Sequence, residues 1–155
     1  MVSKELKRCL EKSKVDFEEM SHKEAFTSQQ VAQAQHVSGE SVIKVVVVKH
    51  GDKFGLLALP ATHRVELSKL ENIFTGEQVR LATEYELGSL FPDCQIGAMP
   101  PFGNLYKLET WADDSLKGSK EIVFQSGDHS STIKMQYKEW DRIVAPKHGD
   151  FSLKA

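Results

Sequence analysis

The chain lacks several features that mark whole classes of protein. Its 155 residues include only two cysteines, Cys9 and Cys94, which are far apart and form no C-x-x-C pair. A disulfide framework and a zinc ribbon are therefore excluded. No stretch approaches the roughly 18 consecutive apolar residues of a membrane span, and the charged N-terminus lacks the apolar segment of a signal peptide. We expect a cytoplasmic protein with two reduced thiols and no membrane partner.

The short motifs of metal, nucleotide and serine-nucleophile sites are also missing. The chain contains no G-x-G-x-x-G, no G-x-x-x-x-G-K-[ST] and no G-x-S-x-G. Its six histidines show neither H-x-x-x-H nor H-E-x-x-H spacing, so we expect no metal site and no cofactor. Cys94 follows a turn-like Phe-Pro-Asp stretch and is a candidate nucleophile. No base that would activate its thiol is visible nearby in the sequence, so an ordinary reduced thiol is the simpler interpretation.

Excess charge of one sign is absent as well. Lys and Arg number 20 against 22 Asp and Glu, a net charge of −2, which excludes a protein that holds DNA through a broad polybasic surface. The charge is uneven along the chain, however. Residues 66–114 carry a net charge of −6, whereas residues 25–65 and 115–155 carry +2 each. An RNA partner gripped through few phosphates is compatible with this distribution.

The remaining composition is that of a globular protein, with 40% hydrophobic and 27% charged residues. We expect one domain over residues 1–155. Apolar periodicity and capping residues predict helices over residues 3–13, 28–37, 67–74, 84–90 and 137–144. Alternating or β-branched runs predict strands over residues 15–20, 41–49, 53–59, 104–111, 122–125 and 132–136. Hairpins with inserted helices indicate an α+β or mixed α/β domain.

Lys44 interrupts the most hydrophobic run of the chain, in which residues 42–48 are otherwise valine and isoleucine. Strand alternation places Lys44 on one face with Val46 and Val48, while Val45 and Val47 face the other side. A lysine in a buried strand loses hydration, so it has to find a partner or point into a cleft. The alternative is a lysine near the end of the strand whose ammonium group reaches water.

Two loops could hold a ligand. The segment Gly97–Gly103 contains two prolines between glycines, so it is rigid and can present backbone groups at little ordering cost. A merely structural turn is the alternative, and an exposed Phe102 would favour binding. His129 follows a glycine turn and could orient a substrate or relay a proton, although histidines in surface turns are common.

These features occur in a fixed order, which is carried by His22 with Thr27, the strand around Lys44, residues 57–61 with 64–67, the segment Gly97–Gly103, and residues 124–129 with 132–135. In this order they resemble the YbaK/prolyl-tRNA-synthetase-associated domain family. That family comprises free-standing aminoacyl-tRNA deacylases related to the editing insertion of bacterial prolyl-tRNA synthetase. The resemblance runs from about residue 15 to residue 145.

The resemblance implies a mixed α/β (α+β) fold around a curved, mostly antiparallel sheet with surrounding helices. It also implies hydrolysis of the ester that joins a wrong amino acid to the terminal adenosine of a tRNA, without a cofactor. The acceptor end of an aminoacyl-tRNA would be the partner, with an aminoacyl-tRNA synthetase as a further candidate. The catalytic positions would be Lys44, Gly97 and His129, and the substrate-binding positions His22, Thr27, Val45, Ala98, Met99, Pro100, Pro101, Phe102, Gly103 and Gly127.

The chemistry suits these residues because an aminoacyl ester is already activated and mainly needs positioning and charge stabilisation. Lys44 would supply positive charge, the backbone of the Gly97–Gly103 loop would hold the carbonyl and α-amino groups, and His129 or the Gly127 backbone would position water. Val45 stands where the family often has a polar residue, and Ala98 replaces a frequent glycine. The pocket should therefore be more apolar and narrower than usual, and the preferred amino acid stays open.

Two other functions remain open from the residues alone. One is a non-catalytic module that binds a tRNA end or a protein, with Lys44 merely gripping phosphate. The other is a metal-free hydrolase of a small ester that acts without tRNA.

Overall fold

The computed structural model describes residues 3–24 and 26–155. The helices are α1 (Lys4–Lys12), α2 (Ser28–Ala34), α3 (Leu67–Ile73), α4 (Glu84–Leu90) and α5 (Tyr137–Val144), with single 3-10 turns η1 (Gly39–Ser41), η2 (Gly103–Leu105) and η3 (Asp114–Leu116). The strands are β1 (Phe17–Ser21), β2 (Ile43–His50), β3 (Lys53–Pro60), β4 (His63–Val65), β5 (Val79–Leu81), β6 (Glu109–Asp113), β7 (Glu121–Gln125), β8 (Ser131–Gln136), β9 (Lys147–Gly149) and β10 (Ser152–Lys154). In these described residues, no helix is long and apolar enough to span a membrane.

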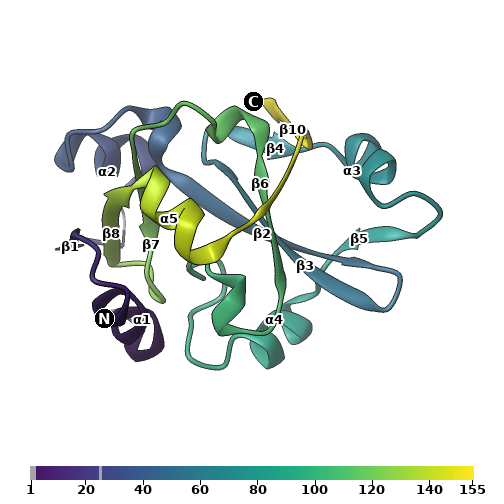
Figure 1. Cartoon of the computed structure of the whole chain (residues 1–155), viewed down its shortest axis with the longest axis horizontal. Coiled ribbons are helices and arrows are strands. Elements are labelled where there is room, and N and C mark those ends of the chain that lie inside the picture. Colours follow the sequence, from purple (N-terminus) through teal and green to yellow (C-terminus); the bar gives the residue numbers. More distant parts are fainter. Residues whose placement is uncertain (1–2, 25) are drawn as a thin grey trace.

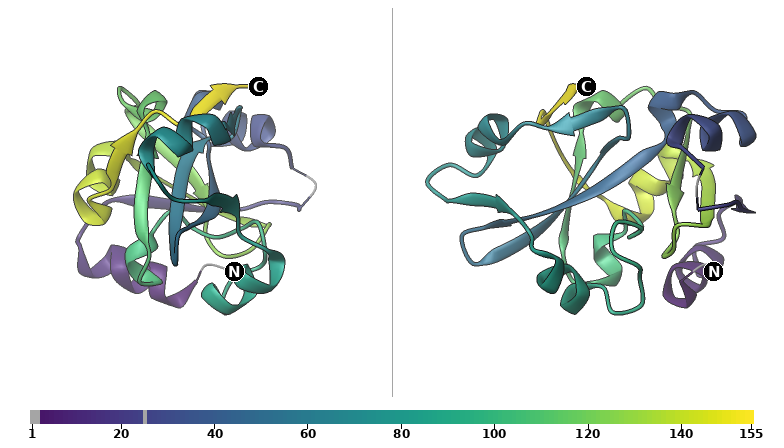
Figure 2. Two further views of the ribbon diagram at one scale, coloured as in Figure 1. Left: turned by 90° about the vertical axis from the view of Figure 1, so that its right-hand side faces the viewer. Right: turned by 180° about the vertical axis from the view of Figure 1, so that it is seen from behind.

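The strands form three groups (Figures 1 and 2). A five-stranded sheet has the order β5-β2-β3-β6-β9, a three-stranded sheet has the order β1-β8-β7, and β10 pairs with β4. Five of the seven strand pairs are antiparallel, and β3–β6 and β6–β9 are parallel. The expected mixed α/β class with a mostly antiparallel arrangement is thus confirmed, although the strands divide into separate sheets.

Capping chemistry sets the helix starts as expected. The Thr83 hydroxyl accepts from the Glu86 amide and the Glu86 carboxylate accepts from the Thr83 amide, which is the predicted capping box of α4. Thr27 and Gln30 form the same motif at α2. Helix α2 ends at Ala34 rather than near residue 37, because His36 takes a positive φ of 58° that ends the helical path.

The strand predicted over residues 104–111 is largely wrong, since β6 starts only at Glu109. Residues 103–105 form the 3-10 turn η2, and Lys107 has a positive φ of 57°. Both conformations are incompatible with an extended strand. The apolar alternation of this segment therefore reflects side chains that pack on the core from an irregular loop.

Four apolar clusters fill the interior. The largest joins α1 and α5 to the sheets through Leu10, Trp140 and Phe124, among others. A smaller cluster packs Val31 of α2 against Val42 and Val123. Val42 and Val123 also form an isolated parallel bridge between the two larger sheets. This junction is where the candidate site lies.

Candidate active site

A cavity of about 300 Å³ opens at the junction of the two larger sheets. Its walls come from α2, the start of β2, the turn after β3, the loop before residue 100, the end of β7 and the start of β8. The lining residues are Phe26, Ser28, Val31, Val42, Ile43, Lys44, Val45, Ala61, Gly97, Met99, Val123, Phe124, Gln125, His129 and Thr132. The fold thus brings together Lys44, Gly97 and His129, which are 53 and 32 residues apart along the chain.

Lys44 contributes a half-buried cation to this cavity. Burial lowers the pKa of its ammonium group, since water solvates the charge less well there. Within residues 3–24 and 26–155, no carboxylate lies within ion-pair distance of it, so its charge is available to a ligand. The flanking strand positions follow the expected alternation, because Val46 and Val48 pack toward α3 whereas Val45 and Val47 pack toward α4.

Gly97 has a backbone conformation that favours glycine, with a φ of +87°. A Cβ atom at this position would lie 3.3 Å from Cε1 of His129. The Gly97 amide donates to Sδ of Met99 at 3.3 Å, and a thioether is only a weak acceptor. A carbonyl oxygen, which is a stronger acceptor, can therefore capture this N–H group.

Hydrogen bonds fix His129 against this loop. Its backbone amide donates to Oε1 of Gln95 at 2.9 Å, and its Nε2 lies 2.8 Å from the Ile96 carbonyl oxygen. A carbonyl oxygen only accepts, so Nε2 carries the proton and, in a neutral ring, Nδ1 is left with a lone pair. Backbone bonds from Gln95 to Gly127 (2.8 Å) and from Gly127 to Ala98 (3.0 Å) tie the two loops together.

Apart from Gly97 and Met99, the Gly97–Gly103 loop lies outside the cavity lining. Phe102 is fully buried and packs on Phe124 at 5.5 Å, so the exposed Phe102 that would favour binding is not present. The Pro101 carbonyl accepts from the buried indole of Trp140 at 2.9 Å. Gly103 approaches the backbone of Leu108 too closely for any side chain. Ala98 is also fully buried, and Pro100 does not line the cavity. These residues pack against the core on the side of the loop away from the cavity and fix its conformation.

His22 and Thr27 flank the cavity without lining it. Thr27 caps α2 with its hydroxyl, and the His22 ring stacks on Phe26 at 5.3 Å. Their neighbours Phe26 and Ser28 are the residues that reach the cavity. Sequence reasoning missed these two, together with the wall residues Val31 and Ala61. Only the helical period of residues 31–37 signalled Val31, as a core position.

Cys94 is not placed as a nucleophile. Its thiol contacts the Tyr106 hydroxyl at 3.2 Å and the Asp93 carboxylate at 3.3 Å. Burial, together with Asp93, raises the pKa of the Cys94 thiol to about 11, which keeps it protonated and unreactive near neutral pH. In the part of the chain that the structure describes, no three histidine, cysteine or acidic side chains gather as metal ligands do.

Comparison with known proteins identifies the family of the chain. The model of the aminoacyl-tRNA editing domain matches residues 22–143. Proline–tRNA ligase of Bacillus subtilis (strain 168) is 31% identical over 125 residues, which cover 74% of this chain and 21% of the ligase. The ligase of Macrococcus caseolyticus (strain JCSC5402) is 28% identical over 129 residues, or 83% of this chain and 21% of the ligase. The chain thus spans about a fifth of the length of these relatives.

Solved structures share the fold. A proposed trans-editing enzyme for prolyl tRNA synthetase superposes with a TM-score of 0.84 at 21% identity, and the match covers 99% of both chains. A longer chain from Marinobacter aquaeolei VT8 contains the same fold in 31% of its length, with a TM-score of 0.78 and 11% identity. The family model covers all the lining residues named above, from Phe26 to Thr132. This chain belongs to the aminoacyl-tRNA editing domain family.

Proposed function

We propose that the chain acts in trans as a deacylase that hydrolyses the ester of mischarged aminoacyl-tRNA at the terminal adenosine. The observation that carries this proposal is the unpaired Lys44 cation in one cavity with Gly97 and His129. The membership in an editing family supports the substrate class. A cavity of about 300 Å³ lies at the small end of ligand pockets, which suits an aminoacyl ester with most of the tRNA outside.

Each residue has a defined task in this reaction. The Lys44 ammonium group places positive charge near the ester, where negative charge develops, or near the adjacent phosphate. The Gly97 amide leaves the weak Met99 acceptor and donates to the carbonyl oxygen of the ester. Nδ1 of His129 accepts a proton from the attacking water and returns it to the departing ribose oxygen as the ester bond breaks. Because the ester is already activated, we propose that no metal ion takes part, and chelation by EDTA should leave the rate unchanged.

The experiment is a panel of tRNAs mischarged with Ala, Cys, Ser or Thr, with ester loss followed over time. Removal of one oxyanion-stabilising group costs about 10²–10³ in rate, so Lys44→Ala should slow deacylation by that factor while the fold is retained. Lys117→Ala is the matched control, because Lys117 pairs with Asp114 and lies outside the cavity. It changes the net charge equally and should leave the rate unchanged.

The outcomes separate the three functions. Near-normal turnover by a folded Lys44→Ala protein would overturn the deacylase assignment. Binding of every charged tRNA without hydrolysis would favour a binding module, and hydrolysis of small aminoacyl esters that lack tRNA would favour a general esterase.

A further inference from the structure

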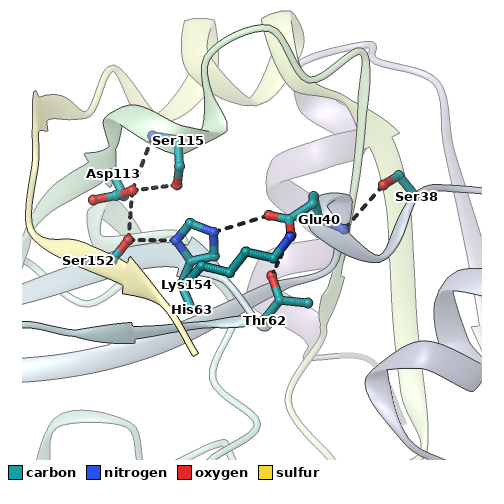
Figure 3. A network of polar contacts seen from close by, with 8 residues as sticks. All are labelled: Ser38, Glu40, Thr62, His63, Asp113, Ser115, Ser152 and Lys154. Atoms are coloured by element: carbon teal, nitrogen blue, oxygen red, sulfur yellow. Dashed lines mark hydrogen bonds and ion pairs between the residues drawn. The ribbon is translucent and has the colours of Figure 1, made fainter.

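A cluster of polar side chains outside the cavity joins the C-terminal strand β10 to β4, β6 and η1 (Figure 3). His63 of β4 lies at its centre, and its side chain is only 12% exposed. One ring nitrogen, Nδ1, lies 2.9 Å from the Ser152 hydroxyl, and the other, Nε2, lies 3.1 Å from the Glu40 carboxylate. The cluster comprises Ser38, Glu40, Thr62, His63, Asp113, Ser115, Ser152 and Lys154.

Donor and acceptor chemistry determines how many protons His63 carries in this network. The Ser152 hydroxyl donates its single proton to Oδ2 of Asp113 at 2.8 Å, so toward His63 it can only accept, and Nδ1 has to donate. A carboxylate also only accepts, so Nε2 has to donate to Glu40. Both bonds together therefore require a doubly protonated, positively charged His63 ring.

The ionisation of the two acids supports this assignment. Burial by itself would raise the pKa of Asp113, but hydrogen bonds from Ser115, the Phe151 amide and Ser152 hold it below its ordinary value. Burial would likewise raise the pKa of Glu40, and it is lowered by the bond from Thr62 and by the charges of the neighbouring cations. Both groups are thus acceptors near neutral pH.

The network is connected to the cavity through two short chain segments. Glu40 lies two residues before Val42 and accepts a hydrogen bond from the Thr62 hydroxyl at 3.0 Å. Thr62 directly follows Ala61, whose amide donates to the Val42 carbonyl at 2.7 Å. Val42 and Ala61 line the cavity, so the bond between Glu40 and Thr62 adds a side-chain link to the direct backbone bond across this wall.

We propose that doubly protonated His63 is a positioning residue that fixes the cavity wall at Val42 and Ala61, and that loss of one ring proton loosens this wall. Histidine is the side chain that changes charge near neutral pH, between about pH 5 and pH 8. A neutral ring offers one donor and one acceptor, so it can keep both its bonds only if the Ser152 hydroxyl turns its proton from Asp113 to Nδ1. While that proton stays on Asp113, a neutral ring keeps its bond to Ser152 or its bond to Glu40, but not both.

The other charges around the ring do not replace either bond. Lys154 of β10 lies 3.5 Å from Oε1 of Glu40 and donates to that oxygen rather than to His63. Asp113 of β6 faces the ring only through the Ser152 hydroxyl. Arg64, next to His63 on β4, is exposed. Among these groups, His63 is therefore the one that contacts Oε2 of Glu40.

Two variants, one at each ring nitrogen of His63, allow a neutral ring to satisfy the partners that remain. In Glu40→Gln, the amide oxygen can still accept from Thr62 and Lys154, while the amide nitrogen donates to the lone pair of a neutral Nε2. In Ser152→Ala, Nδ1 no longer has an acceptor, so a neutral ring protonated on Nε2 satisfies Glu40. Each variant should therefore uncouple the wall from the protonation of the ring.

The experiment follows the ¹⁵N shifts of the His63 ring and the ¹³C methyl signals of Val42 and Ala61 by NMR between about pH 5 and pH 8. In the unaltered chain the methyl signals should move together with the ring titration. In Glu40→Gln and Ser152→Ala the ring should titrate while the methyl signals stay in place. The variant His148→Gln is the control, because the exposed His148 pairs only with Asp141 among the described residues, and it should keep the coupling.

The proposal is overturned if the methyl signals of the unaltered chain do not follow His63, or if the folded variants keep the coupling. Should Glu40→Gln fail to fold, Ser152→Ala carries the test alone. The readout is spectroscopic and does not use deacylation. Absence of turnover would therefore overturn the proposed function while leaving this inference intact.

Discussion

Gly97 and Gly118 provide a matched pair that tests how His129 is positioned. Both glycines have left-handed backbone, with φ of +87° and +90°, so alanine strains each by a similar amount. The cost of this conformation for a residue with a side chain is about 1–2 kcal/mol, partly offset by the lower entropy of the unfolded alanine chain. We expect Gly97→Ala and Gly118→Ala each to lower the free energy of unfolding by about 1 kcal/mol.

The two variants differ only in what the new methyl group meets. At Gly118 nothing lies within 4 Å, whereas at Gly97 the Cβ atom would stand 3.3 Å from Cε1 of His129. The ring has to shift by a few tenths of an ångström, and its 2.8 Å contact with the Ile96 carbonyl lengthens. A misplacement of 1 Å in an active site costs about 10²-fold in rate, so this smaller shift should slow deacylation about 10-fold.

The assays are urea unfolding, single-turnover deacylation of mischarged tRNA, and the NMR signals of the His129 ring. Gly118→Ala should lose stability but keep the rate and the ring signals, and Gly97→Ala should change all three. Equal rates for the two variants, with the His129 signals displaced in Gly97→Ala, would refute the role of His129. Unchanged His129 signals would refute the steric argument itself.

Three further predictions concern the pocket, acid stability and tRNA affinity. Val45→Thr keeps the volume but places a hydroxyl in the cavity, so the rate ratio of Ser-tRNA to Ala-tRNA should rise several-fold in competition assays. Burial would raise the pKa of Glu109, but the hydrogen bond from His50 and the nearby charge of Lys147 lower it. Its stabilising contribution is therefore complete above the unfolded pKa and lost as pH falls through the folded value, and urea midpoints should fall less on acidification in Glu109→Gln. Few phosphate contacts predict a shallow salt dependence of tRNA binding, measured by fluorescence anisotropy between 50 and 200 mM salt, and a steep slope would reveal a basic face.

Local rules made most elements predictable, since their signals lie within a few residues. The Thr83 capping box and the valine-rich strand around Lys44 depend on neighbouring residues only, and both are present in the structure. The short strands β4, β5, β9 and β10 were not predicted, because three-residue strands carry no periodicity and exist only through their partners. The misassigned residues 104–111 show the same limit, since Thr110 fixes Gly103 through a side-chain bond across seven residues.

The candidate site likewise contains some residues that the sequence indicated and others that it did not. Lys44 was predictable from residue type, because a lysine is out of place in a valine-rich strand. His129 was indicated by the glycine turn before it and by the family resemblance. The wall residue Ala61 was not, since nothing in a Pro-Ala-Thr turn indicates that its amide bonds to Val42. The buried position of Phe102 also depends on packing against Phe124, which lies 22 residues away.

The location of the cavity explains why so many long-range hydrogen bonds surround it. The two larger sheets meet there through one isolated bridge, Val42 with Val123, so continuous strand pairing does not fix their relative position. Hydrogen bonds to the loops fix this position instead. Two are backbone bonds, from Gln95 to Gly127 and from Gly127 to Ala98, and the third runs from the Trp140 indole of α5 to the Pro101 carbonyl. Each contributes only about 1 kcal/mol to stability, yet together they set where Gly97 and His129 stand relative to Lys44.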